Sequence, residues 1–143
     1  DVYKRQGYHS DCTRNYVVGG DVSKAPQDFQ DAYAVLADAQ AAARAAAHPG
    51  STAAEIDAIT RKAIAAAGWG DNFVHRTGHG IGLSTHEEPF IMEGNDLTLE
   101  EGMAFSIEPG IYVEGKWGMR LEDIVVLTNN GYESLNLAPR EVR

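Results

Sequence analysis

Cysteine is almost absent from this sequence: Cys12 is the only one in 143 residues. An internal disulfide is therefore impossible, and nothing indicates an oxidising compartment. Basic side chains are also few, since 12 Lys and Arg stand against 21 Asp and Glu and give a formal net charge of −9. This charge argues against a nucleic-acid partner and mildly favours the binding of cations.

Long hydrophobic runs are lacking as well. No apolar run approaches the ~18 residues that would cross a membrane, and no charged start precedes an apolar stretch as in a signal peptide. We expect a cytoplasmic protein with no membrane partner. The hydrophobic content of 43% and the charged content of 23% are ordinary for one globular domain.

Two helices are expected in the first half of the chain, over 26–47 and 52–67. Pro26 suits a first helical turn, and apolar residues then recur at helical spacing. Thr52 and Glu55 have the spacing of a capping box at the start of the second helix.

The remaining segments have the composition of short strands. Residues 8–18 carry β-favouring side chains, and Asn129-Asn130-Gly131 is typical of a hairpin turn. Further strands are expected over 73–76, 103–108, 119–127 and 133–136. The order β, α, α and then several antiparallel strands predicts an α+β fold.

Four side chains that can bind metal stand in motifs marked by glycine or arginine: Asp11, His79, Glu108 and Glu122. One imidazole and three carboxylates form a hard ligand set, which suits Mn, Fe, Co or Zn in hydrolytic chemistry better than a thiolate zinc site does. Three of the four also have an ordinary explanation. Asp11 could cap a strand end, His79 could lie in a glycine-rich turn, and Glu122 could form a surface pair with Arg120.

Two other motif interpretations fail. The repeated Gly-x-Gly around His79 lacks the strand-turn-helix setting of a dinucleotide site. His86-Glu87-Glu88 resembles the start of a zinc-protease helix, but position 90 is Phe90 and Pro89 would break the helix. His75, His79 and His86 nevertheless gather three imidazoles in 12 positions.

The motifs together resemble the pita-bread metallopeptidases, in particular the branch of aminopeptidase P and prolidase. The resemblance covers nearly the whole chain, and the 29 positions from His79 to Glu108 and 14 from Glu108 to Glu122 also fit. It is carried by Gly-Tyr-His-Ser-Asp-Cys-Thr-Arg at 7–14, His-Arg-Thr-Gly-His-Gly-Ile-Gly-Leu at 75–83, His-Glu-Glu-Pro at 86–89, Glu-Gly-Met-Ala-Phe-Ser-Ile-Glu-Pro-Gly-Ile-Tyr at 101–112 and Arg-Leu-Glu-Asp at 120–123.

This resemblance implies two divalent metal ions, with manganese expected first and cobalt, zinc or iron as alternatives. It implies that Asp11 and Glu122 bridge both ions, while His79 and Glu108 hold the first. By the same resemblance Glu108 acts as general base and acid.

Other site residues follow from the same resemblance. His75 and His86 are expected to steady the substrate and the tetrahedral oxyanion. Tyr112 and Arg120 are expected to support the site from behind the ligands.

The sequence departs from the family pattern at its start. The family's first metal-binding Asp lies 11 positions before the second, which corresponds to position 0 here, and Asp1 is one residue out of register. We therefore expect residues 1–6 to be a foreign or non-family lead-in and 7–143 to be the C-terminal portion of a truncated catalytic domain. A complete second metal site is not expected, and the fragment is expected to have low activity.

The function that the resemblance implies is removal of the N-terminal residue from Xaa-Pro peptides, as an Xaa-Pro aminopeptidase or dipeptidase. The expected partner is a peptide with proline at the second position, and the full-length protein is expected to form a homodimer. Two alternatives stay open: a methionine aminopeptidase-like hydrolase, and a non-catalytic peptide-binding module on the same fold.

Overall fold

The computed structural model describes residues 2–143. Asp1, and with it the expectation about its register, lies outside the described residues. Both expected helices are present, as α1 Gln27–Ala46 and α2 Ala53–Ala66. The capping box is confirmed, because the Thr52 side chain accepts from the Glu55 N–H while the Glu55 carboxylate accepts from the Thr52 N–H. Two 3₁₀ turns, η1 Val22–Lys24 and η2 Gly70–Asn72, flank the helical region.

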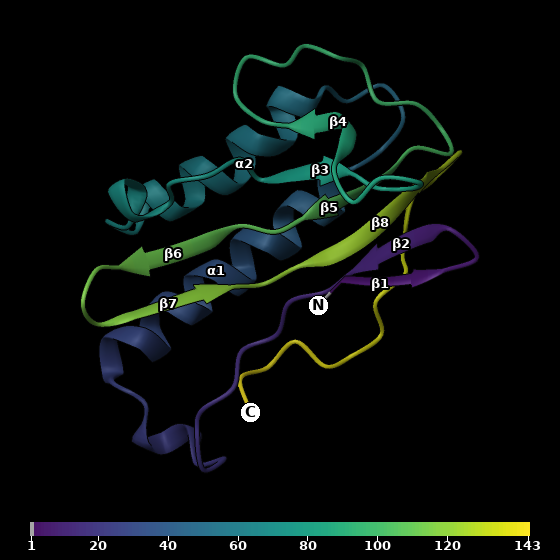
Figure 1. The fold of residues 1–143 in the computed structure, drawn as a ribbon. Coiled ribbons are helices and arrows are strands. Elements are labelled where there is room, and N and C mark those ends of the chain that lie inside the picture. The colour runs from purple at the N-terminus through teal and green to yellow at the C-terminus, as the bar shows by residue number, and fades with distance from the viewer. Residues whose placement is uncertain (1) are drawn as a thin grey trace.

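The strands form one antiparallel sheet of five strands, in the order β4-β3-β5-β8-β9, and two separate hairpins, β1-β2 and β6-β7. Figure 1 shows both helices on one side of these strands. The α+β layout is therefore confirmed. The strand bounds are β1 Val2–Arg5, β2 Tyr8–Asp11, β3 Gly78–Gly80, β4 Glu87–Ile91, β5 Ala104–Ile107, β6 Gly110–Val113, β7 Trp117–Arg120, β8 Asp123–Thr128 and β9 Gly131–Ser134.

The core lies between the helices and the sheet. Successive side chains of a strand point to opposite faces, so Phe105 and Ile107 of β5 pack toward the helices with Ile56 of α2. Ser106, which lies between them, and Glu108, which follows Ile107, point to the other face, where the Ser106 hydroxyl donates to the Glu108 carboxylate. The sheet thus separates an apolar layer from a polar one. Across residues 2–143, neither helix has the length and apolar character that crossing a bilayer requires.

Three expected strands need correction. The single strand expected over 119–127 is two strands, because β7 pairs with β6 whereas β8 pairs with β5. Residues 73–76 form no strand, since the Arg61 side chain, not a neighbouring strand, binds the carbonyls of Phe73 and His75. The strand expected over 8–18 ends at Asp11.

The Gly-His-Gly motif has a packing reason. A Cβ on Gly78 would lie 1.9 Å from the Ser106 carbonyl oxygen, and one on Gly80 would lie 2.1 Å from the Glu88 carbonyl oxygen. These contacts are with backbone atoms of the neighbouring segments, which cannot move aside cheaply. Glycine at both positions therefore lets β3 lie close between its neighbours, with His79 held between them.

Candidate metal centre

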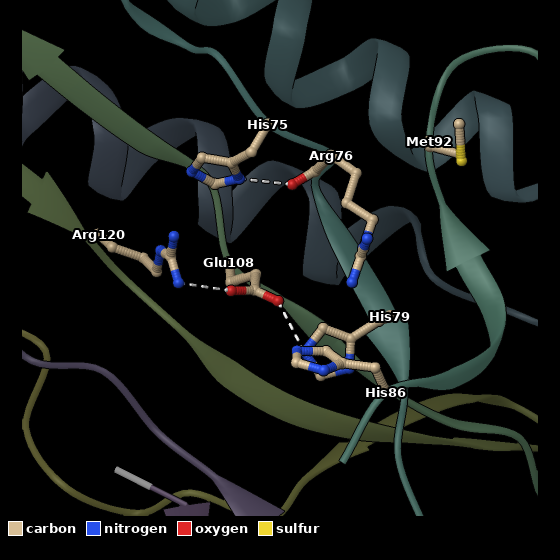
Figure 2. A pocket seen from close by; sticks show the side chains of 7 residues that line it. All are labelled: His75, Arg76, His79, His86, Met92, Glu108 and Arg120. Carbon is tan, nitrogen blue, oxygen red and sulfur yellow. Dashed lines mark hydrogen bonds and ion pairs between the residues drawn. The ribbon is translucent and has the colours of Figure 1, made fainter. Parts of the chain in front are cut away.

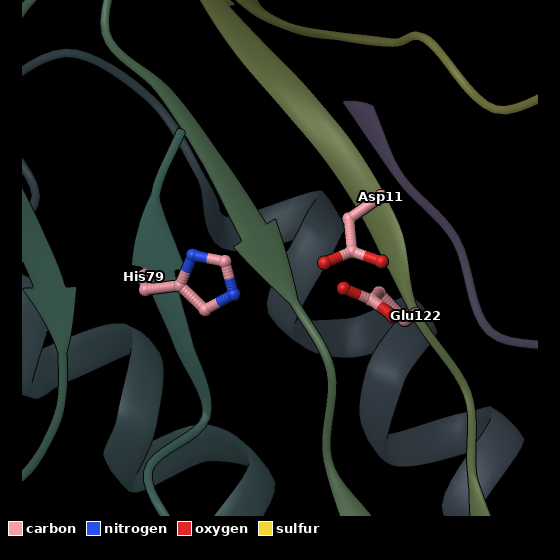
Figure 3. A group of neighbouring side chains, drawn as sticks. All are labelled: Asp11, His79 and Glu122. Atoms are coloured by element: carbon pink, nitrogen blue, oxygen red, sulfur yellow. The ribbon is translucent and has the colours of Figure 1, made fainter. Parts of the chain in front are cut away.

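Three of the predicted ligands converge from distant parts of the chain. Asp11 ends β2, His79 is the middle residue of β3, and Glu122 immediately precedes β8. One ligand atom of each lies within 4.8 Å of those of the other two, and all three side chains are buried. Figure 3 shows the two carboxylates facing one another, with the imidazole directed toward them. This is the spacing at which a single ion could contact all three.

Glu108, which follows β5, adjoins this group. Its Oε1 lies 2.9 Å from the Nε2 of His79 and also accepts from the Ser106 hydroxyl at 2.9 Å. Burial would raise the pKa of Glu108, but its hydrogen bond to His79 and the charge of that ring hold the pKa below its usual value. The structure therefore brings all four predicted ligands together.

The His79 ring is oriented by the backbone. Its Nδ1 lies 3.0 Å from the Gly80 carbonyl oxygen, to which Nδ1–H can donate, and this leaves Nε2 directed at the carboxylates. Burial lowers the pKa of His79, but the Glu108 carboxylate and the hydrogen bond to the Gly80 carbonyl together raise it above its ordinary value. Metal-binding histidines typically donate their other ring N–H in this way, so the ring is oriented as a ligand needs to be.

Glu122 carries the clearest electrostatic signal. It is only 2% exposed, and its Oε1 has no hydrogen-bond partner among residues 2–143, while Oε2 accepts from the Thr13 hydroxyl. Burial and then the nearby charge of Glu108 raise the pKa of Glu122 to about 7. A buried carboxylate oxygen without a partner is costly. The ordinary explanation of Glu122 as half of a surface pair does not apply, and the residues present fit a divalent cation.

A cavity of about 460 Å³ opens beside these ligands. Figure 2 shows its lining, which comprises His75, Arg76, His79, His86, Met92, Glu108 and Arg120. A cavity of this volume is within the range of about 300–1,000 Å³ that small-molecule sites occupy.

Tyr112 and Arg120, which were expected to support the ligands, lie on β6 and β7. The Nη1 of Arg120 lies 3.2 Å from Glu108 Oε2, and its Nε donates to the Tyr112 hydroxyl at 2.9 Å. Arg120 thus pairs with Glu108 and not with Glu122. Both residues lie where they can hold the Glu108 carboxylate in place.

The two other predicted histidines differ in exposure. His86 is exposed at the rim, with its ring centroid 4.2 Å from that of His79. Its pKa is lowered, chiefly by partial burial and then by the charges of His79 and Arg76. His75 is half-buried, and its Nδ1 contacts the Arg76 carbonyl oxygen at 2.7 Å. Its Nε2 is buried without a hydrogen-bond partner among the described residues.

Sequence reasoning missed three residues that shape the centre. Thr13 binds Glu122, and Ser106 connects two ligands, since its hydroxyl donates to Glu108 and accepts from the His79 N–H at 2.9 Å. Arg76 lines the cavity. All three lie inside the quoted motifs. Thr13 is two positions after Asp11, Arg76 is three before His79, and Ser106 is two before Glu108. Their closeness to the ligands in sequence was the available signal.

Comparison with known proteins settles the family. The family model of metallopeptidase family M24 matches residues 2–129. The chain belongs to this family. M24 peptidases act with divalent metals, in agreement with the grouping of Asp11, His79 and Glu122.

Individual relatives give the same result. The chain is 54% identical over 136 residues to a Mycobacterium tuberculosis protein described as "Probable dipeptidase PepE", covering 95% of this chain and 35% of that protein. It is 47% identical to an Xaa-Pro dipeptidase of Lactobacillus delbrueckii subsp. lactis, covering 96% of this chain and 36% of that protein. The chain thus spans little more than a third of the length of these relatives.

A solved prolidase from Thermococcus sibiricus superposes with a TM-score of 0.93 at 41% identity, covering 99% of this chain and 37% of that structure. The expected pita-bread fold is confirmed, with two helices on a mostly antiparallel sheet.

Proposed function

We propose that this chain supplies the metal-binding part of a hydrolase that cleaves the bond between a first residue and proline. One observation supports the proposal most directly. The ligand atoms of Asp11, His79 and Glu122 lie within 4.8 Å of one another, buried beside an open cavity. The names of the relatives support the substrate class, since the Lactobacillus protein is an Xaa-Pro dipeptidase. Residues 7–143 would be the C-terminal portion of the catalytic domain.

The chain's own residues would hold divalent ions with four side chains. His79 and Glu108 would hold one ion, while Asp11 and Glu122 would be shared with a second, and manganese is the metal that we propose. When bound, such ions would acidify water at neutral pH and polarise the scissile carbonyl. The Oε1 of Glu122, which has no hydrogen-bond partner among the described residues, is the atom that such an ion would satisfy. The ion would also take the place of the proton between the His79 Nε2 and Glu108 Oε1, which lie 2.9 Å apart.

The remaining proposed roles concern protons and positioning. Glu108 would take a proton from the attacking water and return it to the leaving amine, and Arg120 with Tyr112 would keep its carboxylate aimed at the site. His86, exposed at the rim, would steady the substrate. His75 would do so less directly, because its Nε2 is buried.

The test is manganese-dependent release of the first residue from an Xaa-Pro peptide, measured beside a Met-Ala peptide. We would assay the chain alone and also joined to the part of the Mycobacterium tuberculosis relative that it does not cover, since the chain covers 35% of that protein. Release from the Xaa-Pro peptide that is lost in Glu108→Gln supports the proposal.

Two results would contradict it. A folded, metal-loaded fusion that cleaves only the Met-Ala peptide would indicate a methionine aminopeptidase-like hydrolase. A fusion that binds peptide without cleaving it would indicate a binding module.

A further inference from the structure

Asp11 and Glu122 come from segments that belong to different sheets. Asp11 ends β2, which pairs with β1 in a separate hairpin, whereas Glu122 precedes β8 of the five-stranded sheet. Their ligand atoms nevertheless lie within 4.8 Å of each other, and Figure 3 shows the two carboxylates face to face. Contacts between the two segments must therefore hold this spacing.

One such contact is made by the side-chain amide of Asn136, which lies just after β9. Its Nδ2 donates to the Asp11 carbonyl oxygen at 3.0 Å, and its Oδ1 accepts from the Ile124 N–H at 2.6 Å. Ile124 is two positions after Glu122. The Leu135 N–H donates to the Ile124 carbonyl oxygen at 2.9 Å, which places Asn136 beside β8. A single amide thus joins the main chain of one ligand to the strand that begins next to the other.

Thr13 makes the complementary contact with Glu122. Its carbonyl oxygen accepts from the Glu122 N–H at 3.3 Å, and its hydroxyl donates to the Glu122 carboxylate. Thr13 thus holds one ligand of the pair, while Asn136 holds the other. Asparagine suits this task because its amide presents a donor and an acceptor together, whereas an ionised carboxylate only accepts.

We propose that Asn136 is a positioning residue of the metal centre. Its amide fixes the main chain of Asp11 against β8 and thereby sets the separation of the Asp11 and Glu122 carboxylates. Asn136 binds no ion in this assignment and acts through Asp11. The inference rests on the proposed ligand set, and it extends the centre to a segment that follows the residues 2–129 matched by the family model.

Asn95 offers a matched control. It is half-buried like Asn136, and its amide makes the same pair of bonds, since it donates to the Phe90 carbonyl oxygen at 2.7 Å and accepts from the Leu97 N–H at 3.2 Å. These bonds join β4 to the loop that follows it, and neither segment carries a proposed ligand. Leucine at either position keeps a similar side-chain size and removes both bonds.

The test is calorimetric titration of manganese at pH 8 into the unaltered chain, Asn136→Leu and Asn95→Leu, with urea denaturation of each protein without metal. Both substitutions should lower the urea midpoint. Only Asn136→Leu should weaken manganese binding, by about 10-fold, the lower end for residues that orient ligands. Asn95→Leu should bind within about 2-fold of the unaltered chain. The electron paramagnetic resonance spectrum of bound manganese, which responds to the arrangement of its ligands, should change in Asn136→Leu alone.

A second variant, Asn136→Asp, separates the two bonds of the amide. The carboxylate can still accept from the Ile124 N–H but cannot donate to the Asp11 carbonyl oxygen. Its added negative charge would by itself attract a cation, so weaker binding would oppose the effect of charge. We expect binding about 10-fold weaker than in the unaltered chain, while hydrogen exchange of the Ile124 amide stays as slow as before.

Three results would overturn the inference and leave the proposed ligands in place. The first is an affinity and a spectrum that do not change in Asn136→Leu. The second is a change of equal size in Asn95→Leu, and the third is binding in Asn136→Asp that is as tight as in the unaltered chain. An unaltered chain that binds no manganese would remove the ligand set, and with it both this inference and the metal-dependent function proposed above.

Discussion

Glu122 and Asp123 are neighbours in the chain, but their side chains lie on opposite faces of the sheet and in opposite electrostatic surroundings. Asp123 is fully buried on the helix side, where Arg14 and Arg140 approach its oxygens to 2.7 and 2.6 Å and Gln40 of α1 donates at 3.0 Å. Glu122 is almost as buried, yet its nearest charged neighbours include the carboxylates of Asp11 and Glu108.

The difference shows how one strand can serve stability on one face and chemistry on the other. A buried carboxylate surrounded by arginines and an amide is satisfied by the protein itself. A buried carboxylate beside other carboxylates stays under-satisfied until a cation arrives. Glu122 thus places a cost on the metal-free fold that a bound metal would remove, while Asp123 connects α1 to the segments of Arg14 and Arg140.

The largest effect is expected from Asp123→Asn. The substitution leaves Arg14 and Arg140 without their buried counter-charge, so the free energy of unfolding should fall by about 3–5 kcal/mol. Urea denaturation of the metal-free protein measures the change. Glu133→Gln, at an exposed position of β9, should change it by less than about 0.5 kcal/mol. If Asp123→Asn lowered the free energy of unfolding no more than Glu133→Gln does, Asp123 would not be the counter-charge that stabilises the two arginines.

Glu122→Gln should act on metal binding. Removal of a charged ligand should weaken manganese binding by about 100-fold or more, since loss of a residue that only supports a ligand already costs up to about 100-fold. Calorimetric titration gives the affinity, and Glu133→Gln is again the control. Unchanged affinity would remove Glu122 from the ligand set.

The same Glu122→Gln protein without metal should be more stable than the unaltered protein. The pKa of Glu122 in the folded state is about 7, above the unfolded value near 4.5, so the folded state holds its proton more tightly. The stability associated with that proton is complete below the unfolded pKa and is lost as pH rises through 7. Glutamine carries no titrating proton. We therefore expect the free energy of unfolding of Glu122→Gln to exceed that of the unaltered protein by about 2 kcal/mol at pH 8 and by almost nothing at pH 4.5.

Denaturation at the two pH values tests this. A loss of stability at pH 8 would mean that the metal-free protein satisfies Glu122 after all.

A smaller effect is expected from Ser106→Ala, which removes the hydroxyl that joins Glu108 to the backbone of His79. Manganese affinity should fall by about 10-fold, the lower end for residues that orient ligands. Asp123→Asn should leave that affinity within about 2-fold, because Asp123 faces the helices. If Asp123→Asn weakened metal binding more than Ser106→Ala did, the two faces would not be separate.

The sequence predicted both helices and all four ligand candidates, because these features are local. The capping box at Thr52, the apolar periodicity of α1 and the motifs around His79 and Glu108 lie within short stretches of chain. The roles of the ligands remain predictions that metal titration must test. The strand that breaks between β7 and β8 could not be foreseen, since the break follows from a change of pairing partner.

The surroundings of the Glu122 and Asp123 carboxylates could not be predicted from the sequence either. Strand alternation separates the two faces, but it does not reveal that Arg14 and Arg140 come from 109 residues before and 17 residues after Asp123. Nor does local sequence show that the Arg61 side chain replaces a strand partner for the segment that carries His75 and Arg76. Such contacts depend on tertiary placement, on which periodicity gives no information.

The most direct test of the account is a calorimetric manganese titration of the unaltered chain at pH 6 and pH 8, in two buffers of different ionisation enthalpy. The raised pKa values of His79 and Glu122 mean that a cation must displace protons to bind near pH 6. We predict binding that tightens by about 10-fold or more between pH 6 and pH 8, with protons released to the buffer. Manganese that fails to bind, or that binds with the same affinity at both pH values and releases no proton, would contradict the assignment of this face as a metal centre.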